Sequence, residues 1–271
     1  MIAAAALVAM TACNKTLIEG PVADSEYGYI NFGLSSDMEI VDTKATVDKE
    51  ESTYNVYLKK GSAYQWSNGG INYKEYSAID EADLTVPAAT DYVIEAENYT
   101  ETEAEAANNS YGDVRVKGTS GQFAVKAGET TNGVTVHCTP VNAKVTVGFA
   151  EDFLSVFTDA QVTLIDGSRQ LVMTPATVTK ENETYKHTTA ETTSIAYFNV
   201  DNGVLSWSIT ARVGNIEKTY SKTFEVEANK WNMITFKAGK DGNILFSITA
   251  DTGITDAKPI TPEVDPLTPV E

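Results

Sequence analysis

Cys13 is the residue of this chain whose setting points most clearly to chemistry. It follows an apolar run, residues 1–12, that ends in Met-Thr-Ala. A bilayer takes about 20 residues to cross, so this run is typical of a signal peptide and not of a membrane helix. A short apolar stretch, a small residue and then cysteine is the pattern of a bacterial lipoprotein signal, in which the thiol is acylated. The alternative is an ordinary apolar N-terminus with an incidental cysteine.

Acylation of Cys13 predicts where the protein is found. Residues 1–12 would be removed, and the polar residues 13–26, which include Gly20-Pro21, would form a tether to the first strand. We therefore expect a protein held in the outer membrane by its lipid alone and exposed at the cell surface.

The charge of the chain bears on its partners. The sequence has 20 Lys and Arg against 38 Asp and Glu, a net charge of −18. Nucleic acid is excluded as a partner, because phosphate binding needs a basic surface. Hydrophobic residues make up 42% of the chain, which is enough for a real core.

Residues for catalysis, metals or cofactors do not form a recognisable set. The two histidines, His137 and His187, stand in separate halves of the chain, and with one remaining cysteine they make no zinc site. The chain has neither a Gly-x-Ser-x-Gly nucleophile elbow nor a glycine-rich phosphate loop. We therefore expect no catalytic residue, no metal and no cofactor, and a protein that is not an enzyme.

Six aromatic side chains gather in one short stretch, interleaved with amides. Tyr64, Trp66 and Tyr73 are the candidates for ligand contact, because aromatic rings stack on sugars or peptides and amides orient the ligand. Host or dietary glycans are the partners that this cluster would fit. The alternative is that Tyr54 and Tyr57 are strand residues and that the others pack a loop over the end of a sheet.

Alternation of apolar and polar residues with period two dominates the rest of the chain, which predicts short strands. The alternating runs occupy residues 27–34, 53–59, 91–97, 114–116, 122–126, 133–138, 143–149, 161–165, 185–189, 194–199, 205–213, 218–226, 231–238 and 244–249. Turn signals separate them, and this spacing predicts a β-sandwich. We expect an all-β protein of two sandwich domains, residues 27–140 and 141–250. Few, short helical turns are expected: residues 101–107 could form about two turns or a solvated acidic loop, and residues 151–157 one amphipathic turn or a loop that closes the end of a core.

Three further residues and the C-terminal tail complete the sequence-based predictions. Cys138 lies in a strand-like run and is expected to be a small buried residue. Trp207 and Trp231 lie in strongly alternating strands and are expected in the core. Residues 251–271 hold four of the eight prolines, which cannot donate to a sheet, so this tail is expected to be extended.

Four motifs occur in a fixed order along the chain after the lipoprotein-like cysteine. They read GYINF at 28–32, LTVP at 84–87, FAVKAGE at 123–129 and VTVHCTPVNAKVTV at 134–147. Their order resembles the fimbrillin-like lipoproteins of the Bacteroidetes, and most of all a family among them that is still called a domain of unknown function. The resemblance spans residues 28–250.

The resemblance implies two sandwiches of transthyretin-like, Greek-key topology and a role in cell adhesion, as a structural or anchor subunit of a pilus or as an adhesin. In pilus-forming relatives a protease removes the lipidated N-terminal strand after a basic residue. A strand of another subunit then fills the groove by strand addition. Lys44 and Lys49 are the corresponding candidates for cleavage here, with Lys44 favoured. The alternative is that both lysines belong to a solvated loop.

The chain departs from this pattern in two places. The proline-rich tail makes a poor donor strand, and residues 14–17 lack the acidic character of a surface-export signal, which leaves a periplasm-facing anchor open. We therefore predict a non-enzymatic, lipid-anchored surface protein that is a fimbrillin-like pilus subunit or adhesin, with a glycan-binding surface lipoprotein as the alternative.

Overall fold

The structure is a computed structural model, and it describes residues 13–15, 26–36, 39–40, 45–46, 50–67, 69–175, 195–200 and 203–251. Several predicted features lie outside these ranges: the signal peptide, most of the tether, Lys44, Lys49, the strand at 185–189 and the proline-rich tail beyond residue 251. None of the helices that the structure describes is long and apolar enough to span a membrane.

Strands dominate the described chain, which confirms the all-β prediction. The strands of the first half are β1 (Cys13–Lys15), β2 (Tyr27–Ser36), β3 (Glu39–Ile40), β4 (Ala45–Thr46), β5 (Asn55–Lys60), β6 (Ala63–Tyr64), β7 (Lys74–Glu75), β8 (Thr85–Pro87), β9 (Ala89–Glu97), β10 (Val116–Thr119), β11 (Phe123–Val125) and β12 (Thr130–Pro140). Those of the second half are β13 (Asn142–Phe149), β14 (Thr158–Asp166), β15 (Arg169–Met173), β16 (Ile195–Asn199), β17 (Val204–Val213), β18 (Ile216–Glu225), β19 (Trp231–Ala238) and β20 (Ile244–Asp251).

Helical structure is confined to short segments. The α-helices of the described residues are α1 (Glu101–Ala106) and α2 (Glu151–Val156), one at each place where the sequence suggested a helical turn. Single 3₁₀ turns are η1 (Glu51–Thr53), η2 (Tyr76–Ala78), η3 (Asn108–Ser110) and η4 (Lys240–Gly242). The expectation of few, short helical turns is therefore confirmed.

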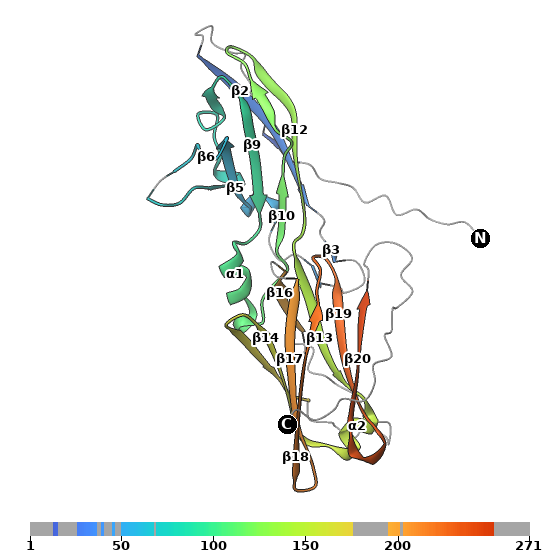
Figure 1. Ribbon diagram of the computed structural model, residues 1–271. Helices are drawn as coiled ribbons and strands as arrows, with labels where there is room; N and C mark the ends of the chain where they lie inside the picture. Colours follow the sequence, from blue (N-terminus) through green and yellow to red (C-terminus); the bar gives the residue numbers. More distant parts are fainter. Residues whose placement is uncertain are drawn as a thin grey trace, which may run out of the picture. The chain divides into compact units, whose positions relative to one another are not determined.

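The chain divides into two compact units (Figure 1). Unit 1 is made of Met1–Met38, Val47–Thr100 and Arg115–Thr139, and unit 2 of Glu39–Thr46, Glu101–Val114 and Pro140–Glu271. The segment Glu101–Val114, which carries α1, belongs to unit 2, whereas a linear boundary near residue 140 would assign it to the first domain.

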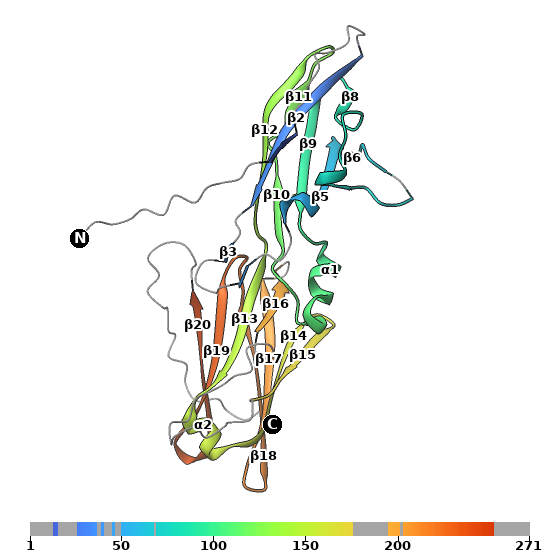
Figure 2. The ribbon, with the colours of Figure 1, turned by 180° about the vertical axis from the view of Figure 1, so that it is seen from behind.

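Unit 1 is built around β2. Its strands follow the order β1-β2-β12-β10-β9-β5-β6, with β8 paired to β2, β11 to β9 and β7 to β5 (Figure 2 labels β8 and β11). β2 runs parallel to β12 and antiparallel to β8. Its alternating sequence turns Ile30, Phe32 and Leu34 into the core, where all three are fully buried.

The first described residues form a strand. Cys13–Lys15 make up β1, which pairs antiparallel with β2 so that Cys13 stands opposite Leu34 and Lys15 opposite Phe32. Three residues that the sequence analysis assigned to the tether thus lie against the edge of unit 1.

Two buried polar groups in the core of unit 1, the Tyr54 hydroxyl and the Cys138 thiol, have hydrogen-bond partners. The Tyr54 hydroxyl donates to Ser36 Oγ at 3.2 Å, and burial raises the pKa of Tyr54 to about 12. Cys138 is fully buried, and its Sγ donates to the carbonyl oxygen of Ala96 at 3.4 Å. Burial also raises the pKa of this thiol to about 12, so Cys138 is the small, inert core residue that its sequence context predicts.

Among the described residues, unit 2 has two four-stranded sheets, β16-β13-β19-β20 and β15-β14-β17-β18, which both contribute to one apolar core, and the short pair β3-β4. The predicted sandwich is therefore seen directly in this unit. Trp207 lies fully buried between Phe236 and Phe246, with ring centroids 5.1 and 4.8 Å away. Phe153 of α2 and Phe157, which directly follows this helix, stack on each other at 4.6 Å and close one end of the core.

Trp231 is not the core residue that the sequence led us to expect. The inward positions of β19 are Ile234 and Phe236, and Trp231 has the opposite parity, so its ring lies half-buried on the outer face. Its indole nitrogen donates to Thr146 Oγ1 at 2.9 Å, and the Lys144 ammonium lies 4.7 Å from the ring centroid. Alternation identified the strand correctly but not which of its faces is buried.

The edge strand β18 carries two lysines in register with buried residues of β17. Lys222 pairs with Trp207 and Lys218 with Ala211, so both point to the core side of the sheet. The Lys218 ammonium donates to the carbonyl oxygen of Gly242 at 2.7 Å, and the Lys222 ammonium lies 5.1 Å from the ring centroid of Phe246. The two side chains lie over the open side of the sandwich at this edge.

Candidate functional site

The outer face of β5 carries the first residues of the candidate site. Val56 and Leu58 are fully buried on one side of this strand, so Tyr57 and Lys59 point to the other side, where both are half-buried. β5 pairs with β9, and this places Tyr57 opposite Glu95 and Asn55 opposite Glu97. The strand pattern thus builds one polar, aromatic face on unit 1.

Two further tyrosines lie on either side of Tyr57. Tyr64 is in β6, which pairs with β5 opposite Lys59, and Tyr73 directly precedes β7, which pairs with the start of β5. The ring centroids of Tyr64 and Tyr73 lie 6.0 and 5.4 Å from that of Tyr57, within the usual range of aromatic contacts. We call Tyr57, Tyr64 and Tyr73 the tyrosine face.

A charged network fixes the central ring. The Tyr57 hydroxyl donates to Glu97 Oε1 at 2.6 Å, and Arg115 Nη2 donates to Glu97 Oε2 at 2.7 Å. The side chains of Arg115 and Glu97 are only 13% and 6% exposed. Because a charge-assisted pair in this setting is poorly screened, Glu97 holds Tyr57 in one orientation.

Lys59 joins the tyrosine face to a second ion pair. Its ammonium donates to Glu95 Oε1 at 2.8 Å and lies 5.0 Å from the ring centroid of Tyr64, a cation–π distance. Burial lowers the pKa of Lys59, but the hydrogen bond and charge of Glu95 outweigh it and raise the pKa overall. Lys59 is therefore charged at neutral pH and supports Tyr64 from the sheet side.

The phenol of Tyr57 stays protonated at all physiological pH values. Burial raises its pKa, and the hydrogen bond to the Glu97 carboxylate and the charge of Glu97 raise it further. Tyr57 is thus a fixed hydrogen-bond donor to Glu97, and its half-buried side chain leaves part of its surface open to a ligand. Tyr64 is 41% exposed and offers the largest free ring surface of the three tyrosines.

Trp66 does not share this face, although the sequence grouped it with Tyr64 and Tyr73. Its side chain is only 9% exposed, and its indole nitrogen donates to the carbonyl oxygen of Asp83 at 3.3 Å. Lys74, at the far end of the same loop, forms an ion pair with the Asp83 carboxylate. Trp66 thus anchors the base of the loop that carries the two tyrosines, and the loop projects from the sheet (Figure 1).

The sequence analysis missed much of the site. Tyr57 was counted in the aromatic stretch but was not among the candidates for ligand contact, and Lys59, Glu95, Glu97 and Arg115 were not singled out. The sequence pattern of residues 53–59 could have indicated two of them, because Tyr57 and Lys59 alternate with the apolar residues Val56 and Leu58 and so lie on the outer face of the strand. The carboxylates could not be found in this way, since they reach the face only through the pairing of β9 with β5.

Other predicted site residues lie elsewhere. Cys13 is the first residue of β1, and the two lysines proposed for cleavage fall outside the described residues. Among the residues that the structure describes, no group of three or more His, Cys, Asp or Glu is arranged to hold a metal ion. What the tyrosine face offers is stacking surface together with charged hydrogen-bonding groups.

Fold and site together define the class: an all-β protein of two units, with an ordered aromatic face on the first. The family follows from the sequence, because the model of the family described as Domain of unknown function (DUF4493) matches residues 26–266. The chain belongs to this family. The wider fimbrillin-like assignment stays a prediction.

Comparisons with individual proteins show similarity and do not assign a role to this chain. No curated protein matches the chain. A candidate cell adhesion protein from Bacteroides ovatus is 8% identical with a TM-score of 0.41, over 85% of this chain and 99% of that one. Another from Bacteroides eggerthii is 11% identical with a TM-score of 0.42, over 87% and 98% of the two chains.

A third solved structure is a candidate polysaccharide binding protein from Bacteroides thetaiotaomicron. It is 9% identical with a TM-score of 0.40, over 84% of this chain and 99% of that one. Likenesses of this size are too weak to assign a function.

Proposed function

We propose that this protein is a lipid-anchored surface adhesin that binds glycans through the tyrosine face of unit 1. The observation that carries the proposal is the clustering of Tyr57, Tyr64 and Tyr73 on one outer face, with centroids 5.4 and 6.0 Å apart. Sugar rings have an apolar C–H face that stacks on an aromatic ring and hydroxyl groups that pair with charged side chains. The face offers both.

Preorganisation supports this use of the face. Glu97 orients Tyr57, Lys59 supports Tyr64, and Trp66 anchors the loop that leads from Tyr64 to Tyr73. A ligand that meets rings already held in place loses less conformational entropy on binding than one that must order them. The polar, aromatic and partly exposed surface is suited to repeated, low-affinity contacts along a polysaccharide.

Glycan-array binding of the folded protein tests the proposal. We expect Tyr64→Ala and Tyr73→Ala each to weaken binding about tenfold or more, as the loss of one stacking contact would. Tyr27→Ala is the matched control, because Tyr27 is also in unit 1 and 50% exposed but lies outside the face. If no array sugar binds the wild type, or if Tyr27→Ala weakens binding equally, the proposal is wrong.

Trp66→Ala, which the sequence alone would have suggested, is a poor test. Since Trp66 is buried, its removal would cost fold stability and disturb the loop before it tested any ligand contact.

The membrane anchor is a separate part of the proposal. Cys13 begins the strand that pairs with β2, so an acyl chain on Cys13 would hold unit 1 directly at the membrane. We expect Cys13→Ala to move the protein from the membrane fraction to the soluble fraction of its host. Intact mass gives the control, since a wild-type protein without a diacyl or triacyl mass at Cys13 would exclude lipid anchoring.

A pilus subunit is the second candidate function, and the position of β2 favours it. β2 lies between β12 and β8, and both lysines proposed for cleavage follow it in the chain. Cleavage after Lys44 or Lys49 would separate β1 and β2 from the rest of the protein. A groove would then open where Ile30, Phe32 and Leu34 are now buried, and a strand of another subunit would fill it.

The mature N-terminus decides between a retained anchor and a processed subunit. A mass beginning at Ala45 or Glu50, without lipid, is expected for a pilus subunit. In that case a peptide with the sequence of residues 27–36 should block polymer growth, and a peptide with Phe32 replaced by Asp should not. A mass beginning at acylated Cys13 in every molecule would rule out a processed, polymerising subunit and leave only a lipid-anchored one.

A further inference from the structure

An extra residue interrupts the pairing of β14 with β17 in unit 2. Thr158 stands opposite Arg212 and Gln161 opposite Thr210, so three steps along β14 match two along β17. This is a β-bulge, a feature that turns a side chain away from its regular direction and is common beside binding sites. The residue after Thr158 is Asp159, and its φ of +53° is left-handed.

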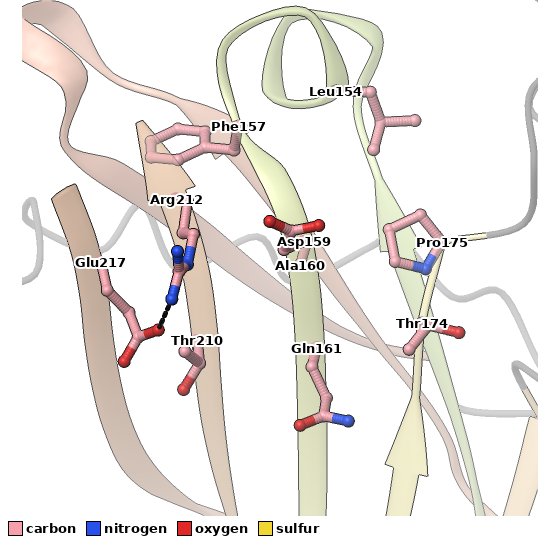
Figure 3. Close-up of a pocket in the computed structure, with 10 residues that line it drawn as sticks. All are labelled: Leu154, Phe157, Asp159, Ala160, Gln161, Thr174, Pro175, Thr210, Arg212 and Glu217. Carbon is pink, nitrogen blue, oxygen red and sulfur yellow. Dashed lines mark hydrogen bonds and ion pairs between the residues drawn. The ribbon is translucent and has the colours of Figure 1, made fainter. Parts of the chain in front are cut away.

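The bulge borders a cavity of about 650 Å³. Figure 3 shows Asp159 and Gln161 on β14 between Arg212 on one side and Pro175 on the other. The apolar part of the lining is Leu154, Phe157, Ala160 and Pro175, and the polar part is Asp159, Gln161, Thr174, Thr210, Arg212 and Glu217. All of these residues belong to unit 2.

The polar groups of this cavity differ in how far they are already engaged. Arg212 Nη2 and Glu217 Oε2 form an ion pair at 3.1 Å, with both side chains about half exposed. The Thr210 hydroxyl is bonded to that of Thr219. Within the part of the chain that the structure describes, the side chains of Asp159 and Gln161 have neither a hydrogen bond nor an ion pair. A carboxylate and an amide are thus free to meet a ligand.

The backbone conformation at Asp159 also favours a role in binding. A left-handed φ is uncommon outside glycine, although aspartate tolerates it better than most residues, and glycine would adopt it at no cost. What aspartate adds at this position is a carboxylate, directed into the cavity by the bulge. Strain at a position whose side chain lies free in a cavity is the pattern that marks a binding site.

We propose that this cavity binds a neutral saccharide. Two carboxylates and one guanidinium leave the lining with an excess of negative charge, which disfavours an anionic ligand. Asp159 can accept from sugar hydroxyls, Gln161 can both donate and accept, and the wall of Leu154 and Pro175 suits the C–H face of the ring. The volume falls within the range of small-ligand sites. The site is additional to the tyrosine face, with which it shares no residue.

The test uses the full chain and defined sugars. The probes are the methyl glycosides of glucose, galactose and N-acetylglucosamine, followed by chemical-shift changes in NMR spectra. We expect at least one to bind with a Kd of about 1 mM, typical of a small neutral ligand. Asp159→Asn should weaken this binding about tenfold, because the amide keeps one accepting oxygen but loses the charge that strengthens the hydrogen bond.

Matched controls separate this site from the rest of the protein. Glu225→Gln is the same kind of change on β18 outside the cavity, and Tyr64→Ala removes the main ring of the tyrosine face. Glu225→Gln should bind the probe as the wild type does. In Tyr64→Ala the shift changes of residues around the tyrosine face should shrink, while those of residues around Asp159 should stay as in the wild type. The wild type should bind glucuronic acid more weakly than methyl glucoside. In Asp159→Asn the affinities for these two sugars should be closer to each other.

Asp159→Gly gives a second, opposite readout. Glycine relieves the left-handed strain, so the thermal midpoint should rise while sugar binding is lost. The proposal is overturned if none of the three glycosides binds, if Asp159→Asn and Glu225→Gln bind equally well, or if Tyr64→Ala abolishes the shift changes around Asp159. In the last case the sugar is bound at the tyrosine face and not in this cavity.

Discussion

The ion pair of Glu97 and Arg115 should be essential to the stability of unit 1, and the substitution Glu97→Gln tests this. Glutamine keeps an oxygen that can accept from the Tyr57 hydroxyl, so the hydrogen bond at 2.6 Å need not be lost. What is lost is the negative charge beside the guanidinium of Arg115, 2.7 Å away. The substitution therefore isolates the effect of an uncompensated charge.

The magnitude follows from burial. The two side chains are 13% and 6% exposed, so this pair belongs with buried ion pairs and not with surface ones. Breaking a buried pair by removing one partner costs about 3–5 kcal/mol, whereas a surface pair contributes about 1 kcal/mol or less. Since Arg115 Nε also donates to the carbonyl oxygen of Tyr99, part of the guanidinium stays satisfied, and we expect about 3 kcal/mol.

Native-state hydrogen exchange in graded urea is the assay. The amides of β5, β9 and β10 report the free energy of unfolding of unit 1, and those of β17 and β18 serve as an internal control in unit 2. In Glu97→Gln the first set should exchange with about 3 kcal/mol less protection, and the second set should not change. The double variant with Arg115→Met should recover at least half of the loss, because it removes the unpaired charge.

A loss below about 1 kcal/mol in Glu97→Gln would refute the reasoning, because the pair would then behave as an exposed one. So would a double variant less stable than the single one, since the remaining guanidinium could not then be the source of the cost.

Three further predictions concern stability. The pKa of Cys138 is about 12 in the folded protein against 9.0 unfolded, so the buried thiol stabilises the fold fully below pH 9 and loses that contribution as the pH rises to 12. In Cys138→Ala the free energy of unfolding should therefore fall less steeply between pH 9 and 12, by about 1.4 kcal/mol per pH unit. Urea titrations that give the same slope for the variant and the wild type would contradict this. The Tyr220 hydroxyl is buried with no partner among the described residues, so Tyr220→Phe should leave stability unchanged or raise it by about 1 kcal/mol, and a clear loss in urea unfolding would mean that the hydroxyl is satisfied. Gly112 has a φ of +86° and a Cβ there would lie 2.8 Å from the Tyr197 carbonyl oxygen, so Gly112→Ala should lower the free energy of unfolding by about 2–4 kcal/mol. Gly128 also has a left-handed φ but open space around it, so Gly128→Ala should cost only about 1–2 kcal/mol. Equal losses in the two variants would show that the close approach at Gly112 is relieved.

The alternation of apolar and polar residues was enough to predict an all-β protein, because a strand that is buried on one side has apolar residues at every second position. It could not tell which face of a strand is covered by the rest of the fold. Trp207 and Trp231 both lie in alternating strands, yet only Trp207 is in the core, since its parity matches the inward residues of its sheet and that of Trp231 does not. The deciding information is the packing of one sheet on another, which is not local.

The candidate site was predicted in part for the same reason. Tyr64 and Tyr73 were recognisable as aromatic residues near a turn, but Trp66 was grouped with them because it is close in sequence. It turns inward because Asp83, 17 positions further along the chain, offers a carbonyl oxygen there. The bulge at Asp159 could not be foreseen either, since it arises from a register shift between two strands and has no turn-type sequence signature.

The lysines of β18 have a consequence for how this molecule meets copies of itself. An exposed edge strand of ten residues is a ready template for another chain, and such contacts lead to aggregation. Lys218 and Lys222 place two positive charges along the open side of the sandwich at this edge, so a second copy docking there would bring four ammonium groups together. These charges disfavour the pairing of two copies of unit 2 edge to edge at β18.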